Sequence, residues 1–309
     1  MRITVIINPI SGAGGRVDAG ASRARLAAAF LDTHQIDHEL LVTERPGHGF
    51  DLARGAVTRG ATVVCAWGGD GTVNEVAAAL AFTPAALAII PAGSGNGLAR
   101  ELRIPKQPAA ALAVAVSGDE RSIDAGELAG RIFVNLAGIG FDAEIARRFA
   151  DRAPGRRGFI PYLTIAASQA LTYEPATYSI AVGARRWRQR AFMIVLANAR
   201  QYGNGAVIAP GAAPDDGWLD LVIVHDVSLW RILSRIPAMF RGTLAEEAGV
   251  ITMLRFEEAE ISSDENTWLH ADGEAMASPA SVRARVLPNA LRVRVPSRKP
   301  TADRLTADS

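Results

Sequence analysis

The chain has 309 residues, of which 49% are hydrophobic and 21% charged, and its formal net charge at pH 7 is +1. This length allows one large domain or two ordinary ones, the composition is that of a globular protein, and the near-neutral charge does not indicate a nucleic-acid partner. Cys65 is the single cysteine, which excludes an intramolecular disulfide and a thiolate metal cluster.

The first 120 residues alternate between strand patterns and helix patterns. Short apolar, β-branched runs are each followed by a turn and a helical segment, and such units predict a parallel sheet covered by helices. We expect strands over 3–7, 38–43, 62–66 and 87–90, and helices over 17–33, 47–58, 72–81, 96–101 and 106–117. In such sheets, ligands bind at the carboxyl ends of the strands.

From about residue 122 the patterns become those of a β-rich protein. We expect strands over 122–128, 131–137, 177–182, 190–197, 219–224, 258–262 and 282–286, and helices over 160–172 and 228–241. The sequence therefore predicts an α/β domain over 1–121 and a β-rich, sandwich-like domain over 122–296. A last strand over 290–296 could return to the first domain, and residues 297–309 are expected to form a disordered tail.

Three glycine-rich loops, at 8–15, 68–75 and 91–98, each follow a predicted strand. The carboxyl ends of parallel strands share one edge of the sheet, so we expect the loops to converge there. Glycine lets the backbone approach a ligand, and a helix start offers unpaired N–H groups to phosphate. Asp70 fits this interpretation if a divalent cation joins it to the phosphates; alternatively, it caps the helix that follows a tight turn. Together the loops favour a nucleotide site.

Several other nucleotide and catalytic sites are disfavoured. The Walker A pattern is absent, and the only lysines, Lys106 and Lys299, lie outside the glycine loops, so neither a P-loop nor a protein-kinase site is indicated. The first loop matches the dinucleotide-binding pattern only loosely. A Ser-His-Asp hydrolase is disfavoured because no G-x-S-x-G segment is present.

Six short segments follow one another in an informative order. They are NPISG at 8–12, GGDGT at 68–72, PAGSGN at 91–96, NARQYG at 198–203, DDGWLD at 215–220 and HADGE at 270–274. In this order they resemble the catalytic domain of diacylglycerol and sphingosine kinases, and are most similar to the soluble bacterial lipid kinases of that family. The resemblance covers about residues 3–296. It implies an NAD-kinase-like α/β domain followed by a β sandwich.

The resemblance also implies a role for individual residues. Glu274 would be the general base toward the lipid hydroxyl, Asp124 an acidic residue between the domains, and Asp70 would act through magnesium. Asp216 would hold a structural magnesium with the main-chain carbonyls of Ala213 and Trp218. The residues implied to line the ATP site are Asn8, Ser11, Gly12, Thr43, Gly68, Gly69, Asp70, Gly71, Thr72, Asn74, Gly93 and Ser94.

These roles imply ATP- and Mg²⁺-dependent phosphorylation of a lipid hydroxyl, with diacylglycerol as the leading acceptor. The alternatives are a sphingoid or other lipid kinase, an NAD kinase, and a non-catalytic nucleotide-binding protein that keeps the fold. Asp70, Asp124 and Glu274 argue against the last of these, since a binding module needs no base. His270 is a second candidate base, although a histidine beside a loop is more often a polar surface residue.

The lipid substrate implies contact with a membrane surface. No apolar run approaches the roughly 20 residues of a membrane span, so we expect a cytoplasmic protein that meets the membrane peripherally. Two stretches that combine arginine with aromatic residues, 147–163 and 185–190, suit an anionic membrane, and each is equally well explained as a solvated face. The sequence leaves the oligomeric state open, a homodimer included.

Overall fold

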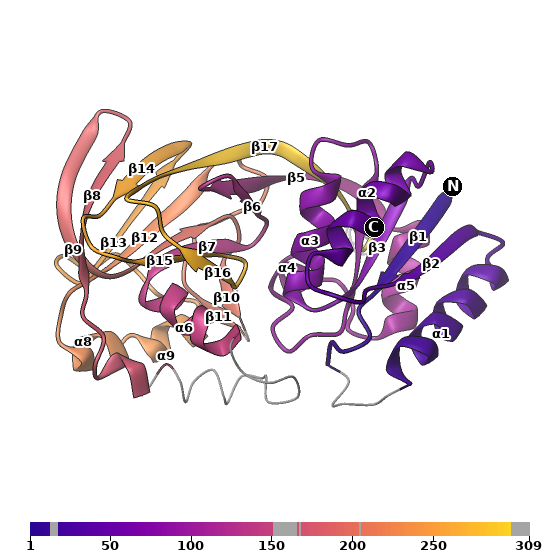
Figure 1. Cartoon of the computed structure of the whole chain (residues 1–309), viewed down its shortest axis with the longest axis horizontal. Helices are drawn as coiled ribbons and strands as arrows, with labels where there is room; N and C mark the ends of the chain where they lie inside the picture. The colour runs from indigo at the N-terminus through magenta and orange to yellow at the C-terminus, as the bar shows by residue number, and fades with distance from the viewer. Residues whose placement is uncertain (13–17, 151–165, 167, 204, 298–309) are drawn as a thin grey trace, which may run out of the picture.

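The computed structural model describes residues 1–12, 18–150, 166, 168–203 and 205–297 and consists of two lobes joined by long strands (Figure 1). The first lobe contains a parallel sheet in the order β4-β3-β1-β2. Its strands are β1 (Arg2–Ile7), β2 (Asp37–Val42), β3 (Val63–Gly68) and β4 (Ala86–Pro91). β3 and β4 are buried along their whole length, as their unbroken apolar sequences predict for a sheet covered on both faces.

Five helices surround this sheet. They are α1 (Ala19–Thr33), α2 (His48–Thr58), α3 (Asp70–Leu80), α4 (Gly97–Glu101) and α5 (Pro108–Ser117). α2 packs beside α3 and α1 beside α5. α5 begins at Pro108, where the missing N–H of proline costs no helical hydrogen bond. The predicted α/β architecture is confirmed, and the helix and strand boundaries differ from the predictions by only a few residues.

The second lobe is an antiparallel assembly in the order β16-β15-β7-β9-β8-β14, and β12 and β13 extend it from β9. Its strands are β7 (Leu136–Gly140), β8 (Ala176–Val182), β9 (Arg185–Ala197), β12 (Leu219–His225), β13 (Ile251–Phe256), β14 (Glu258–Ser262), β15 (Trp268–Ala271) and β16 (Glu274–Ala277). Along β12, Leu221 and Ile223 belong to one apolar cluster and Val222 to another. Alternate side chains of this strand therefore bury both faces of the sheet, which confirms the β-rich, sandwich-like class.

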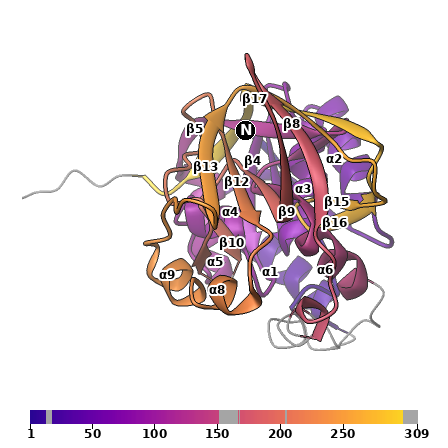
Figure 2. The ribbon, with the colours of Figure 1, turned by 90° about the vertical axis from the view of Figure 1, so that its left-hand side faces the viewer.

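The second lobe also contains helices α6 (Phe141–Ala150), α8 (Leu229–Leu233) and α9 (Ile236–Arg241) and a small hairpin of β10 (Gln201–Gly203) and β11 (Ala206–Val207). α6 packs on β15 and β16, and α9 packs on β11. Figures 1 and 2 both show α6, α8 and α9 at the lower end of this lobe.

Two long strands connect the lobes, β5 (Asp119–Leu128) and β17 (Ser281–Val295), which pair with each other antiparallel. β17 also pairs with β14 in the second lobe and, parallel, with β4 in the first, through Arg292 and Val293. The register between β5 and β17 is interrupted between Leu287 and Leu291, where Asn289 has a φ of +51°. A single strand therefore serves both lobes, where the sequence predicted separate strands over 282–286 and 290–296.

Other differences from the sequence prediction lie mainly in the second lobe. The predicted strand over 131–137 is divided into β6 (Arg131–Phe133) and β7, because the main-chain N–H groups of residues 134–136 bond to a carboxylate instead of a neighbouring strand. The predicted helix over 228–241 is two helices, since Pro237 is tolerated only in a first turn. Strands β13, β15 and β16 and helix α6 were not predicted.

Of the predicted helix over 160–172, residues 160–165 and 167 lie outside the described residues, and the described residues 166 and 168–170 are helical, as predicted. The predicted tail over 297–309 lies outside the described residues except for Ser297. Within the described part of the chain, no helix is long and apolar enough to cross a bilayer.

Candidate active site

The three glycine-rich loops meet at the carboxyl edge of the first sheet, as the sequence predicts. A Cβ built on Gly93 would lie 2.7 Å from the Cα of Gly69, and one on Gly12 would lie 1.9 Å from the carbonyl oxygen of Ala92. The Gly69 N–H donates to Ser11 Oγ at 3.3 Å. Only glycine permits these approaches, and Gly12 in addition has a φ of +61°. The loops therefore form one continuous backbone surface.

Asp70 joins the second loop to the third. Its Oδ2 accepts a hydrogen bond from the Asn96 N–H at 2.9 Å, and its Oδ1 accepts one from the Gly97 N–H at 2.7 Å. Asp70 thus caps α4 and not α3, its own helix, whose N-cap is Gly69 with no side-chain bond. Asn96 has a φ of +52° and bonds through its side chain to both main-chain polar groups of Gly93. The carboxylate and the amide hold the third loop in one conformation.

The remaining predicted nucleotide residues lie around these loops. Asn8 Nδ2 donates to Thr72 Oγ1 at 2.9 Å, which ties the first loop to α3. Thr43 is buried after β2, and its N–H donates to the Ile7 carbonyl. Ser94 is exposed, and Gly68 ends β3. A Cβ on Gly71 would meet open space, so its lack of a side chain is not required by packing.

Asn74 links α3 to the second lobe. Its Nδ2 donates to the Ile132 carbonyl at 3.0 Å and to Asp272 Oδ2 at 2.7 Å. Asp272 also accepts hydrogen bonds from three consecutive N–H groups, those of Val134, Asn135 and Leu136, at 2.8–3.0 Å. Burial raises the pKa of Asp272, and these four donors oppose that shift. This buried carboxylate fastens the two lobes together.

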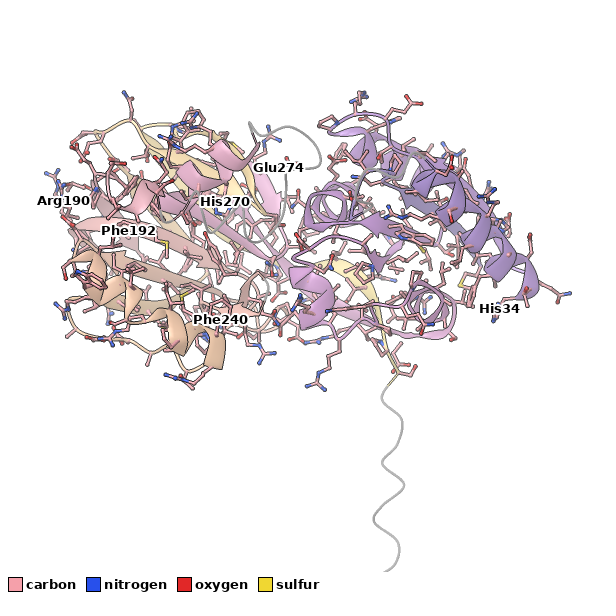
Figure 3. All side chains as sticks on the ribbon, turned by 90° about the horizontal axis from the view of Figure 1, so that it is seen from below. His34, Arg190, Phe192, Phe240, His270 and Glu274 are labelled. Carbon is pink, nitrogen blue, oxygen red and sulfur yellow. The ribbon has the colours of Figure 1, made fainter. Side chains whose placement is uncertain are left out.

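Glu274 is the first residue of β16, immediately after the turn formed by Asp272 and Gly273, whose φ angles are +46° and +89°. Its side chain reaches solvent beside the first lobe (Figure 3). Nearby protein atoms partly desolvate the carboxyl and raise the pKa of Glu274. The charges of Glu75 and Asp272 add to this shift, and Arg131 opposes it. A carboxyl with a raised pKa beside an open interface is suited to proton transfer.

His270, the alternative base, is enclosed. Only 3% of its surface is exposed, its Nδ1 accepts a hydrogen bond from the Gly273 N–H at 3.2 Å, and its Nε2 lies 3.0 Å from Asp142 Oδ2. Because Nδ1 is an acceptor, Nε2 carries the hydrogen that is shared with Asp142. His270 therefore supports the turn that precedes Glu274 and does not face the interface between the lobes.

Asp124 lies in β5, where 2% of its surface is exposed. Its Oδ2 accepts from the Gly217 N–H at 2.7 Å and its Oδ1 from the Asn289 N–H at 2.8 Å. Its own N–H donates to the Pro214 carbonyl. Asp124 thus contacts the loop of the predicted structural magnesium and the irregularity in β17, and its catalytic role stays a prediction.

The loop over 213–218 is held by an arginine. Asp216 Oδ1 accepts from the Trp218 N–H at 3.1 Å, and its Oδ2 lies 3.2 Å from the Arg255 guanidinium. Arg255 also donates to the Gly211 carbonyl at 2.7 Å and lies 3.8 Å from Asp220. Burial raises the pKa of Asp220, and Arg255 counteracts this shift.

Comparison with known proteins identifies the family. Residues 2–128 match the family described as diacylglycerol kinase catalytic domain, and residues 135–295 match the YegS C-terminal NAD kinase beta sandwich-like domain. A Chromohalobacter salexigens protein named "Probable lipid kinase YegS-like" is 35% identical over 82% of this chain and 83% of its own. A Mycobacterium tuberculosis protein named "Diacylglycerol kinase" is 30% identical over 94% of each chain. The chain belongs to this lipid kinase family.

The fold of the kinase is likewise that of a solved relative. A crystal structure described as a diacylglycerol kinase from Bacillus anthracis aligns with a TM-score of 0.70 and 21% identity, over 95% of this chain and 96% of its own. The resemblance seen in the sequence is thereby confirmed at the level of family and fold.

The residues of the kinase around Asp216 offer few side-chain ligands to a structural metal. Within the described ranges there is no group of three or more His, Cys, Asp or Glu side chains that could hold a metal ion. Asp216 is the one carboxylate that the sequence assigned to this site, and it is already paired with Arg255. The geometry fits a loop cross-linked by a guanidinium, and a magnesium ion here would have to share Asp216 with it. The assignment of Asp216, Ala213 and Trp218 stays a prediction.

Sequence reasoning missed the residues that assemble the kinase. Asp272 stood inside the HADGE segment and was passed over for Glu274, although a carboxylate beside glycine in a turn is a frequent anchor for main-chain N–H groups. Arg200, in the NARQYG segment, forms an ion pair with Glu101 of α4 at 3.0 Å. Nothing in the linear sequence pairs these two residues, since they are 99 positions apart.

Proposed function

We propose that this lipid kinase transfers the terminal phosphate of ATP to the hydroxyl of diacylglycerol, with Glu274 as the general base. The observation that carries the proposal is the position of Glu274. Its exposed carboxyl has a raised pKa, is close enough to Glu75 of α3 to be influenced by its charge, and follows the turn anchored on Asn74. The 30% identical relative named "Diacylglycerol kinase" supports the choice of acceptor.

The chemistry assigned to the chain is positioning and proton transfer. The glycine-loop surface would receive the phosphates through those of its N–H groups that do not already donate to Ser11, Asp70 or Asn96. A divalent cation, when bound, would neutralise phosphate charge. Asp70 is a carboxylate of the glycine loops that could help to hold it. As the lipid hydroxyl oxygen bonds to the terminal phosphorus, its proton passes to the Glu274 carboxylate. The bond from phosphorus to the ADP oxygen breaks. General base catalysis of this kind is typically worth about 10²–10⁴-fold in rate.

The test is transfer of labelled phosphate from ATP, with magnesium, to lipids in mixed micelles. The acceptors are diacylglycerol, monoacylglycerol, ceramide, sphingosine and phosphatidylglycerol, with NAD as a further acceptor. Glu274→Gln keeps the shape of the side chain but removes the base, and Glu257→Gln is the matched control, because Glu257 is an exposed glutamate of the same lobe.

Label in diacylglycerol, reduced at least about 100-fold by Glu274→Gln and unchanged by Glu257→Gln, is the expected result. If only a sphingoid base or only NAD is labelled, that molecule replaces diacylglycerol as the assigned acceptor. Full activity of Glu274→Gln would remove the proposed base while leaving the kinase assignment intact. Binding of ATP without turnover on any acceptor would favour a protein that kept the fold and lost the reaction.

A further inference from the structure

Helices α8 and α9 carry an exposed apolar cluster. Trp230 is 82% exposed and Phe240 49%, and Leu233 and Ile236 are about two-fifths exposed. These four are among only twelve large apolar side chains exposed in the described part of the chain, yet they fall within eleven consecutive residues. Scattered exposed apolar residues need no explanation, whereas such clustering marks an interaction surface.

Helix α9 and the turn before it are held against the lobe. On the inner side, Ala238 and Met239 pack against the apolar cluster that includes Val222. Arg235 donates to Glu247 at 2.7 Å, which anchors the turn between the two helices. The exposed side chains therefore cannot be buried by a simple rotation of α8 and α9 onto the lobe.

Arginines alternate with the apolar residues along these two helices. The segment 227–243 contains Arg231, Arg235 and Arg241 and no acidic residue. Arg231 and Arg241 are exposed, although Arg231 also lies 3.6 Å from Glu247. Aromatic and aliphatic side chains bordered by arginine are typical of elements that lie at the interface of an anionic bilayer, with the rings at headgroup depth and the guanidinium groups on phosphates.

The two arginine-rich stretches noted in the sequence give weaker support for a membrane-binding surface. In the hairpin over 185–190, Trp187 packs against the core of the lobe, and Arg190 pairs with Asp226 at 2.7 Å. In α6, Arg147 and Arg148 both bond to Glu144. Most of the remaining stretch, 151–163, lies outside the described residues.

The cluster lies at the same end of the second lobe as α6. α8 and α9 share the lower end of the second lobe with α6, which packs on the strand that begins with Glu274 (Figures 1 and 2). Viewed from below, Phe240 and Glu274 lie on the same lobe toward opposite edges, with Glu274 next to the first lobe (Figure 3).

We infer that α8 and α9 dock the kinase on an anionic membrane surface, with Trp230 and Phe240 inserted among the headgroups and Arg231 and Arg241 on lipid phosphates. The inference rests on the proposed function, because a bilayer is where a lipid acceptor is met. Docking would hold the second lobe against the surface that contains the substrate.

The test is co-sedimentation of the full chain with vesicles of phosphatidylcholine alone or with added phosphatidylglycerol. The variants are Trp230→Ala/Phe240→Ala and Arg241→Glu, and the control is Leu26→Ala/Phe50→Ala, which removes two exposed apolar side chains from the first lobe. Wild-type protein should bind the anionic vesicles at least about 10-fold more tightly than the neutral ones, with the excess lost in high salt.

The double aromatic variant should lose about 10-fold in affinity or more, and Arg241→Glu about 5–25-fold on anionic vesicles only, while the control binds as wild type. Wild-type binding by both variants would overturn the inference. So would a wild-type dimer that the double aromatic variant makes monomeric, since a second copy would then cover this face.

Activity on a water-soluble, short-chain diacylglycerol separates this inference from the proposed function. All docking variants should keep wild-type turnover on that substrate and lose activity only on vesicles. Vesicle binding without turnover on any lipid would contradict the proposed function and leave the docking surface standing.

Discussion

The contact between Asn74 and Asp272 should couple the two lobes, and a double-mutant cycle can measure this. In Asp272→Asn, one carboxylate oxygen becomes an NH₂ group, which then faces N–H donors in either orientation of the amide. Two of the four hydrogen bonds are lost, each worth about 1.5–3 kcal/mol because the acceptor is charged. Part of this loss is offset because a charge no longer has to be buried. We expect the free energy of unfolding to fall by about 2–4 kcal/mol.

Asn74→Ala removes the donor to Asp272 and to the Ile132 carbonyl and should cost about 1–3 kcal/mol. Both changes act on the same interlobe hydrogen bond, which Asp272→Asn either removes or leaves with an uncharged acceptor. The double variant should therefore lose about 0.5–2 kcal/mol less than the sum of the two single losses. The measurement is urea unfolding of the three variants, followed by two probes to verify that the lobes unfold together.

Asp264→Asn is the matched control, because its side chain is 99% exposed in the same lobe, and its effect should be additive with that of Asn74→Ala. A coupling energy for Asn74 and Asp272 within about 0.3–0.5 kcal/mol of zero would refute the assignment of this contact as the fastening between the lobes.

Three further predictions concern the site itself. Because the pKa of Glu274 is raised and only the ionised carboxylate accepts a proton, kcat/KM should fall as the pH decreases through a pKa above the ordinary value of about 4.3. A pH–rate profile measures this fall, and the acid limb of the profile should vanish in Glu274→Gln. In Gly93→Ala, the new methyl group meets the Gly69 backbone, so the affinity for ATP should fall about 10-fold or more by calorimetry; an unchanged Kd would show that the loops separate freely. Arg255→Met leaves Asp216 and Asp220 without their cation and should lower Tm by about 2–4 °C, and added Mg²⁺ should recover part of this loss in the variant but raise Tm little in wild type. A wild-type Tm that drops equally on adding EDTA would contradict the guanidinium cross-link.

Much of the first lobe was predictable because its determinants are local. The apolar runs of β3 and β4 and the glycine loops after them follow directly in sequence, and parallel strands bring their carboxyl ends to one edge. The loops therefore had to converge once the strands were recognised. In the second lobe the signals were weaker: β15 and β16 have four residues each, and the strand ladder depends on partners more than 100 positions away, such as Leu269 with Ile139.

The amino-acid sequence alone determined the family, the two-lobe architecture and the glycine surface, since each depends on residue types in short, ordered segments. Only the tertiary structure shows which groups surround each carboxylate. Asp70, Asp124 and Asp272 are all used by main-chain N–H groups from distant segments, and Glu274 is left facing solvent with a raised pKa. The residue type of a carboxylate does not reveal its environment. Its role depends on the donors, charges and solvent around it, which only the folded chain brings together.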